Sequence, residues 1–305
     1  MTLQQTRTLT RTAFFLLFLL APLLDIFRFD LTLGHFIFFG HAWTLDIQDI
    51  LSGDSVDAAI RIFTRMLLPL IAFISITLFL IWKYGRIYCG WLCPHFSVVE
   101  MFNQLMLKQL NRVTIWEKPI KPNNRVLPKI IVAVPSILMA FIWAVGLLSY
   151  LLPPKPLFNE LIHFDLGFGA TLFITVATLI FSFDFIFTRH IFCKYGCALG
   201  LFQSLIWMAN KKAMVIRFDR QRARACRDCS LNAKDKPCDA ACPMRLPTRN
   251  MKRAKFTCTQ CGQCIAACSK VQQGDPQGSL LHWVSGEKAV EVDRPANTIE
   301  IKEIK

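Results

Sequence analysis

The sequence predicts a mainly α-helical chain in which a polytopic membrane bundle of about four helices precedes a small cysteine-rich domain. Three observations lead to this prediction. Hydrophobic residues make up 53% of the 305 residues, and the mean hydropathy of +0.39 is unusual for a soluble globular protein. Long apolar stretches all lie before residue 190, and eight of the twelve cysteines fall between Cys226 and Cys268. We therefore expect a transmembrane domain over 1–209, a cysteine-rich domain over 210–283 and a C-terminal tail over 284–305.

Four apolar stretches are candidates for crossing the membrane, which takes about 20 residues. They are Ala13–Phe27, Met66–Trp82, Ile130–Leu152 and Leu166–Phe187. The first is short, and it also fits the apolar core of a cleaved signal peptide. Because Pro22 and Asp25 stand where a small-residue cleavage site would be, we expect this stretch to be an anchor.

Basic residues divide the loops into two classes. Lys and Arg gather in the N-terminus, in the 83–129 loop and after the fourth stretch, whereas loops 28–59 and 153–165 carry mostly Asp and Glu. The positive-inside rule therefore predicts a multi-pass protein of the bacterial inner membrane whose N-terminus and cysteine-rich domain are cytoplasmic. Within the outer loop, LTLGHFIFFG (31–40) is too short to span and is expected at the membrane interface.

An internal repeat relates two hairpins of the membrane domain. IYCGWLC (87–93) and IFCKYGC (191–197) both read Ile-aromatic-Cys-x-aromatic-x-Cys. Each follows an apolar stretch and leads into an amphipathic segment, so both are expected at the cytoplasmic mouth of the bundle. The paired cysteines of this repeat are Cys89, Cys93, Cys193 and Cys197.

The cysteine-rich domain contains two four-cysteine runs. The run from Cys258 (CTQCGQCIAACS) has the spacing of bacterial ferredoxins, and the run from Cys226 (CRDCSLNAKDKPCDAACP) is the same motif with an enlarged loop. In such motifs three close thiolates bind one 4Fe–4S cluster, and the fourth cysteine binds the other cluster. The first predicted cluster is held by Cys226, Cys229, Cys238 and Cys268. The second is held by Cys242, Cys258, Cys261 and Cys264.

Other interpretations of this domain are weaker. Zinc is the main alternative because Cys-x2-Cys pairs also form tetrahedral sites, but two complete ferredoxin-like runs disfavour it. The segment from Lys211 to Lys255 carries fourteen Lys and Arg against four Asp and Glu. This charge is suited to balancing clusters or binding an acidic redox partner, or else to contacting anionic lipid. Nothing indicates a nucleic-acid recognition fold.

The four paired cysteines have three chemically reasonable roles. They could bind a third iron–sulfur cluster, bind copper(I) through soft thiolates, or cycle as redox dithiols. If each pair were helical, both of its sulfurs would share one face. The alternative is that they are small buried residues, which their duplication disfavours. His95 and His190 lie beside the pairs and are weaker candidates for a metal or quinone site.

Several segments resemble the FixG/RdxA/CcoG family of membrane iron–sulfur proteins, within the wider group that includes NapH and NosR. In chain order they are RFDLTLGHFIFFG (28–40), DIQDI (46–50), GRIYCGWLCP (85–94), FCKYGCALGLFQS (192–204), TRNMKRAKFTC (248–258) and QGSLLHW (277–283). The chain departs from the family in three ways: Ala198 replaces a motif proline, the first ferredoxin run has its enlarged loop, and the family's C-terminal extracytoplasmic domain is not expected here.

The resemblance implies electron transfer, with reduction of Cu(II) to Cu(I) during assembly of cbb-type cytochrome oxidase. The oxidase assembly machinery would then be the partner. NapH-like proteins imply the alternative of a conduit that passes electrons from quinol to a partner reductase. A third alternative is a scaffold in which the clusters only brace the fold. In the two redox interpretations, the paired cysteines are the expected reactive groups and the eight ferredoxin cysteines bind the cofactors.

Overall fold

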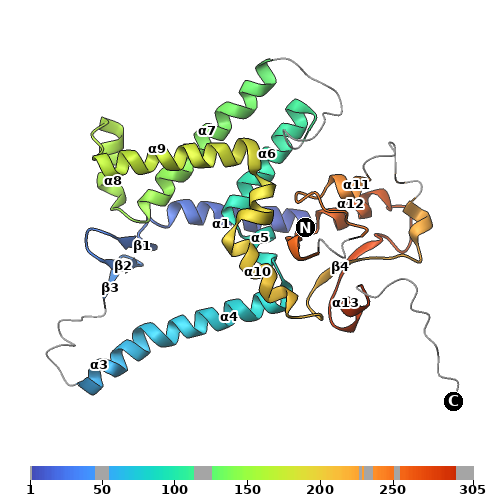
Figure 1. Ribbon diagram of the computed structural model, residues 1–305, viewed down its shortest axis with the longest axis horizontal. Coiled ribbons are helices and arrows are strands. Elements are labelled where there is room, and N and C mark those ends of the chain that lie inside the picture. Colours follow the sequence, from blue (N-terminus) through green and yellow to red (C-terminus); the bar gives the residue numbers. More distant parts are fainter. Residues whose placement is uncertain are drawn as a thin grey trace. The chain divides into compact units, whose positions relative to one another are not determined.

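The computed structural model describes residues 2–44, 55–112, 126–226, 229, 236–250 and 255–292. The chain forms two compact units, each assembled from segments that are distant in sequence (Figure 1). Unit 1 comprises Met1–Leu9, Ile76–Trp91 and Cys193–Lys305, and unit 2 comprises Thr10–Ser75 and Leu92–Phe192. The DIQDI segment (46–50) and most of the expected tail (293–305) lie outside the described residues.

Three helical stretches of the described chain are long and apolar enough to cross a membrane. They are Phe63–Tyr84 (the π-helical turn η1, Phe63–Leu67, with α4, Leu68–Tyr84), Val126–Ser149 (α7), and Phe168–Thr188 (α9, Phe168–Phe183, with the π-helical turn η2, Asp184–Thr188). Most of their apolar side chains point outward, which fits a hydrocarbon environment. On α4, for example, Ile81 is the buried residue. These helices correspond to three of the four predicted spans.

The first predicted span, Ala13–Phe27, is not one continuous helix. Helix α1 (Leu3–Leu20) holds only its first part, and a turn then leads to strand β1 (Phe27–Asp30). Pro22 has no amide hydrogen to donate, and Asp25 has a φ of 51°, so the helix cannot continue through this turn. Among the described helices α1 is not apolar enough to count as a span, because its N-terminal half is polar.

Unit 2 also contains a small antiparallel sheet in the order β1, β2 (His35–Phe38), β3 (His41–Trp43), followed after a gap by α3 (Ser55–Ile62). The segment expected at the membrane interface (31–40) forms the first turn and the second strand of this sheet. Its alternation of Phe with other residues suits a strand, since neighbouring side chains point to opposite faces.

An ion pair anchors the first strand of this sheet. Arg28 donates to a carboxylate oxygen of Asp25 and to one of Asp30, both at 2.6 Å. Burial raises the pKa of Asp30, but hydrogen bonds from Thr32 and Arg28 outweigh burial and lower the pKa to about 2. The ionised carboxylate is thus part of the folded sheet.

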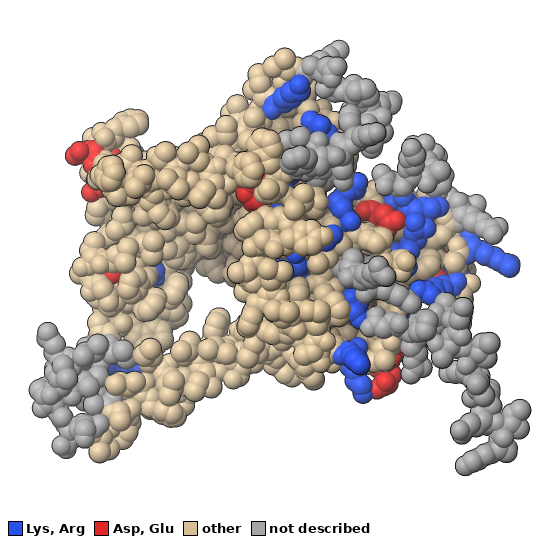
Figure 2. Space-filling model, in the orientation of Figure 1, with Lys and Arg blue, Asp and Glu red and all other residues tan. Residues whose placement is uncertain are grey.

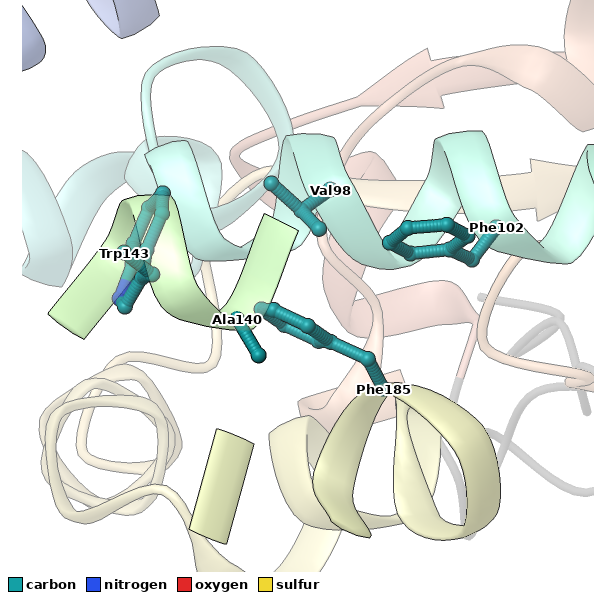
Figure 3. Close-up of a cluster of buried hydrophobic side chains, with 5 residues drawn as sticks. All are labelled: Val98, Phe102, Ala140, Trp143 and Phe185. Atoms are coloured by element: carbon teal, nitrogen blue, oxygen red, sulfur yellow. The ribbon is translucent and has the colours of Figure 1, made fainter. Parts of the chain in front are cut away.

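The helical core of unit 2 lies where α6 (Pro94–Leu110) meets α7 and η2. Figure 3 shows Val98 and Phe102 of α6 facing Ala140, Trp143 and Phe185, all of them buried. Helix α8 (Pro154–His163) closes the other end of α7 through Leu157. The most apolar window of α7 is 33% buried, against 6% for Phe63–Tyr84, so α7 is the central helix of this unit.

Unit 1 combines the cysteine-rich region with parts of the two membrane hairpins. From the hairpins come α5 (Ile87–Trp91), most of η3 (Phe192–Gly196) and α10 (Ala198–Met208). Strand β4 (Val215–Phe218) pairs antiparallel with β5 (Leu281–Val284). The remaining elements are η4 (Ala223–Cys226), α11 (Pro237–Ala240), η5 (Lys255–Thr257), α12 (Gln263–Val271) and α13 (Glu287–Glu291).

Candidate metal centres

Two cavities of unit 1 are each lined by four cysteines. Cavity A is lined by Cys226, Cys229, Cys238 and Cys268. Cavity B is lined by Cys242, Cys258, Cys261 and Cys264. The structure therefore brings together the two sets that the ferredoxin crossover pattern assigns, with the last cysteine of each run at the cavity of the other run. All twelve cysteines of the chain are free of disulfides.

Helix α12 provides one cysteine to each cavity. Cys264 and Cys268 both lie on this helix and both are buried, one helical turn apart. The helix begins after Gly262, which has a φ of 69°. A β-carbon at this position would also lie 2.8 Å from the Trp283 ring, so both the backbone angle and the space favour glycine.

Cavity A is partly exposed and has a cationic rim. Lys236 and Arg249 line it together with the four cysteines. The Lys236 ammonium donates to the carbonyl oxygen of Cys226 at 2.9 Å, and the Arg249 guanidinium donates to Asp239 at 3.3 Å. Burial raises the pKa of the Cys226 thiol, and the Arg249 charge acts in the opposite direction. A negatively charged group at cavity A would therefore have two cations beside it.

Cavity B is apolar. Apart from its cysteines it is lined by Ile216, Met244, Leu246, Thr248 and Thr259. Burial raises the pKa of Cys242 to about 11 and also raises the pKa of Cys258 and Cys264. Each cavity thus offers four cysteine sulfurs, and the two sets lie in different environments.

The residues around both cavities fit 4Fe–4S clusters. Nitrogen donors already reach three of the sulfurs: the Leu246 amide reaches Cys242 at 3.4 Å, the Leu280 amide reaches Cys268 at 3.3 Å, and the Gln272 side chain reaches Cys229 at 3.4 Å. N–H donors to ligand sulfurs, together with burial, are among the features by which proteins tune such clusters. The donor set and its surroundings therefore suit this cofactor.

The paired cysteines occupy equivalent places in the two hairpins. Cys89 lies in α5 and Cys193 in η3, and both are buried. Cys93 and Cys197 are the residues that precede α6 and α10, with φ,ψ of −55°,116° and −76°,111°. Both second cysteines are thus non-helical, so neither pair lies on one continuous helix and the condition for both sulfurs to share a helix face is not met. Pro94 accounts for this at Cys93, because proline disfavours the helical conformation in the residue before it.

Helix α5 packs directly on the backbone that carries the cavity B cysteines. The Trp91 indole donates to the carbonyl oxygen of Gln260 at 3.0 Å. A β-carbon added at Gly90 would overlap the carbonyl oxygen of Thr259 and lie 3.3 Å from the Cys261 amide nitrogen. The N-terminal segment joins this contact, since Gln4 donates to the Cys261 carbonyl at 3.1 Å and Arg7 to the Gly90 carbonyl at 2.8 Å.

These contacts were not predicted from the sequence. Cys89, Cys193 and Cys197 belong to unit 1 together with cavities A and B, whereas Cys93 is assigned to unit 2. The buried Gln203 of α10 accepts a hydrogen bond from the Cys89 thiol at 3.4 Å. In the sequence, the contact region around α5 was indicated by the GRIYCGWLCP motif, which surrounds the first cysteine pair and contains Arg86 and Gly90.

Unit 2 holds a part-buried acid–imidazole pair. The His95 Nε2 lies 2.8 Å from a carboxylate oxygen of Asp184. The rings of Phe185, Phe192 and Trp143 surround the imidazole at centroid distances of 5.6, 5.5 and 6.3 Å. Asp184 begins the π-helical turn η2, and such turns are frequent at functional sites. His95 was a weak sequence candidate, while Asp184 was not predicted at all.

Charge is distributed unevenly over the surface. Figure 2 shows Lys and Arg gathered over the part of the chain that contains α11, α12 and β4, and mostly uncharged residues over the long helices. This distribution follows the sequence pattern of a basic cysteine-rich region after an apolar one.

The chain matches the Fer4_5 family, described as a 4Fe-4S binding domain, over residues 64–112 and 168–215. The two matched stretches begin 104 positions apart, as do Cys89 and Cys193, and each stretch contains one cysteine pair. The match thus follows the internal repeat of the membrane hairpins, outside the two ferredoxin-like runs.

Three similar proteins are informative. YccM of Escherichia coli, a putative electron transport protein, is 26% identical over 66% of this chain and 53% of its own length. The ferredoxin-type protein NapH of E. coli is 24% identical over 67% of this chain and 65% of its own length. The regulatory protein NosR of Pseudomonas aeruginosa is 26% identical over 67% of this chain and 25% of its own length.

The chain therefore spans about half the length of YccM and a quarter of NosR. No solved structure matches the chain. The likeness to NapH and NosR agrees with the wider group that the sequence motifs indicated, without singling out the FixG-type branch. The chain thus combines three helices long and apolar enough to cross a membrane with a match to a 4Fe-4S binding domain, and it is similar over about two thirds of its length to YccM, NapH and NosR.

Proposed function

We propose that this protein carries electrons at a membrane and that its eight ferredoxin cysteines hold two 4Fe–4S clusters. One observation carries the proposal: two complete sets of four cysteines converge on cavities A and B. When bound, such clusters supply one-electron redox chemistry. The chain itself would hold the thiolates, keep water from cavity B and donate hydrogen bonds to the sulfurs.

The paired cysteines are proposed as a further redox site. The Fer4_5 match over both hairpins favours a third iron–sulfur cluster there over copper or a dithiol pair. The contact between α5 and the Thr259–Cys261 backbone supports exchange of electrons with cavity B, because Cys89 is adjacent to Gly90 in the same short helix. We further propose the domain limits 1–209, 210–283 and 284–305, with the cysteine-rich domain on the cytoplasmic side of a bacterial inner membrane.

The His95–Asp184 pair of unit 2 favours a hydroquinone as the electron donor. Oxidation of a hydroquinone to a quinone releases two electrons and two protons. His95, held by the Asp184 carboxylate among three aromatic rings, is chemically suited to accept one of these protons. An ionisable pair beside a spanning helix is costly to keep unless it has such a use. A partner reductase, as in the NapH-like interpretation, would then receive the electrons.

Copper reduction during oxidase assembly is the alternative acceptor chemistry, and the comparisons lend it no support. It predicts that cells without the protein lose oxidase activity and regain it when copper is added. The conduit proposal predicts that added copper has no such effect. A scaffold without a redox role would require clusters that do not change oxidation state over the physiological range of potentials.

The decisive experiment measures reduction of the protein by a hydroquinone. Anaerobically purified protein in detergent is first analysed for iron and acid-labile sulfide, where about eight of each per chain indicate two clusters and about twelve indicate three. Reduction by a short-chain hydroquinone and by dithionite is then followed in the visible spectrum. His95→Gln and Asp184→Asn should slow the first reaction at least tenfold and leave the second unchanged, and the exposed His163→Gln is the matched control. Equal rates in all variants would exclude the pair from the reaction.

A further inference from the structure

Arg86 is a buried cation with no carboxylate partner among the residues that the structure describes. The residue is 1% exposed, and it precedes α5 in the turn that follows α4. Its Nε and Nη1 atoms have no hydrogen-bond partner in the described part of the chain. No ion pair of Arg86 occurs there either. A charge that is buried and left unpaired is strongly destabilising, so its retention points to a negative group that completes the site.

The surroundings of the guanidinium are the paired cysteines. Its Nη2 donates to the carbonyl oxygen of Cys193 at 2.7 Å and lies 4.0 Å from the Cys89 sulfur. Gly200 of α10 faces the same nitrogen, and a β-carbon there would overlap it and lie 3.2 Å from the Cys193 carbonyl oxygen. The two hairpins therefore meet at this one side chain, one of them contributing Cys89 and the other Cys193.

Arg86 is also connected to cavity B through α5, which begins at the next residue. Gly90 of α5 lies so close to the Thr259 carbonyl oxygen that a β-carbon would overlap it, and the Cys261 amide nitrogen is beside the same position. Burial is the main influence on the Cys258 thiol and raises its pKa, and Arg86 acts in the opposite sense. Arg249 has the corresponding effect on Cys226 and Cys238 at cavity A. Each of the two cavities thus lies within the field of a different arginine.

Metal binding gives thiols a negative charge. Cysteine binds metals as the thiolate, so protons leave when a metal centre forms. An iron–sulfur cluster and a copper(I) ion held by several thiolates both carry net negative charge at the ligand sulfurs. A planar guanidinium with several donors is suited to this environment, since it retains its charge when buried and can donate to sulfur and carbonyl at once.

We propose that Arg86 is the internal counter-ion of a metal–thiolate centre that includes Cys89 and Cys193, and that it electrostatically couples this centre to cavity B. The inference rests on the proposed redox role of the paired cysteines. Arg86 acts here as a positioning and tuning residue at the point where the two hairpins meet.

The test compares Arg86→Gln, Arg86→Lys and Arg249→Gln in the full-length protein in detergent. Iron, sulfide and copper are counted per chain, and the potential of each centre is measured by titration monitored by electron paramagnetic resonance. We expect Arg86→Gln to lose the metal of the paired cysteines and to disfavour reduction at cavity B at least tenfold, or about 59 mV for one electron. Arg86→Lys should retain both properties, and Arg249→Gln should change only the centre at cavity A.

Three results would overturn the inference. Unchanged metal content and potentials in Arg86→Gln would show that the charge is not used. Equal losses in the Gln and Lys variants would show that the shape of the side chain matters and its charge does not. If the double variant Cys89→Ser/Cys193→Ser loses no metal, the paired cysteines bind none and Arg86 has no such counterpart. The two clusters of cavities A and B would remain as proposed in that case, so the two failures are distinguishable.

Discussion

Gly90 lies so close to the carbonyl oxygen of Thr259 that a residue with a side chain does not fit at position 90. A β-carbon at position 90 would overlap this oxygen and lie 3.1 Å from the carbonyl carbon. The atoms in the way are backbone, and they belong to the turn that carries Cys258 and Cys261. A membrane hairpin and a ferredoxin-like loop, 169 residues apart, are thereby joined through main-chain contact.

The first prediction is that Gly90→Ala disrupts the centre at cavity B. Overpacking of a tight site costs about 1–3 kcal/mol, and here a rigid turn must shift to relieve it. We expect iron and sulfide to fall by about four atoms each per chain, the content of one cluster. Gly274→Ala is the matched control, because a β-carbon there meets nothing within 4 Å. Full metal content in Gly90→Ala would show that the contact is not needed for the centre.

The second prediction concerns how the cysteines are shared between the runs. Cys238 and Cys242 lie in the same run but line different cavities. Cys242→Ala should therefore abolish the same electron paramagnetic resonance signal as Cys261→Ala, and Cys238→Ala the same signal as Cys229→Ala. Signals that instead pair Cys242 with Cys238 would contradict the shared arrangement. Zinc without sulfide in the wild-type protein would overturn the cluster assignment altogether.

Local rules explain why the cysteine sets could be predicted. The spacing of ligands around a cluster is fixed by the cofactor, so the four members of each set follow from the sequence and line one cavity each. The three long spans could also be predicted, since apolar length alone identifies them. Neither rule needs knowledge of distant contacts.

The remaining features depend on contacts that no local pattern encodes. Arg86 looks like one more basic residue at the end of an apolar helix, and only its burial beside Cys193 distinguishes it. The role of Asp184 is apparent only from its contact with the imidazole of His95, which is 89 positions away in the sequence. The first apolar stretch is interrupted by a turn at Asp25, whose positive φ is not evident from apolar length. Strands of three or four residues, such as β3, are too short to show a clear period.

The third prediction is a pH dependence of the small sheet in unit 2. The pKa of Asp30 lies at about 2 in the folded protein, below its usual value of 3.8. A lowered carboxylate pKa stabilises the fold above the usual value, and this stabilisation is lost as the pH falls from about 4 toward 2. Hydrogen exchange over residues 27–43, measured by mass spectrometry, should show Asp30→Asn opening more readily than wild type at pH 6.

The difference between the two proteins should shrink as the solution is acidified below about pH 4, because the carboxylate is then protonated in the opened sheet, where its pKa has the usual value of 3.8, while it stays ionised in the folded sheet down to about pH 2. Asp25→Asn is the control for this comparison. Its side chain binds the same Arg28 but is 41% exposed, against 1% for Asp30, so a smaller change is expected. A constant difference from pH 6 to pH 3 would show that the charge of Asp30 contributes nothing to the sheet.

The fourth prediction concerns which of the two centres, at cavity A or at cavity B, has the higher reduction potential. Cavity A is partly exposed and has Lys236 and Arg249 on its rim, whereas the other lining residues of cavity B are uncharged. Adding an electron to a cluster adds negative charge, which nearby cations and water stabilise. The centre at cavity A should therefore have the higher potential and be reduced first in a titration.

Removal of the rim charges tests this order. The double variant Lys236→Gln/Arg249→Gln should have a lower reduction potential at cavity A and an unchanged potential at cavity B. A tenfold change in the reduction equilibrium corresponds to about 59 mV for one electron. Lys212→Gln, which removes an exposed charge paired with Glu287 away from both cavities, controls for net charge. If the double variant titrates like wild type, the cations do not set the order. If cavity B is reduced first, the influence of Arg86 on its cysteines outweighs that of the two rim cations, and electrons would collect on the side of the paired cysteines.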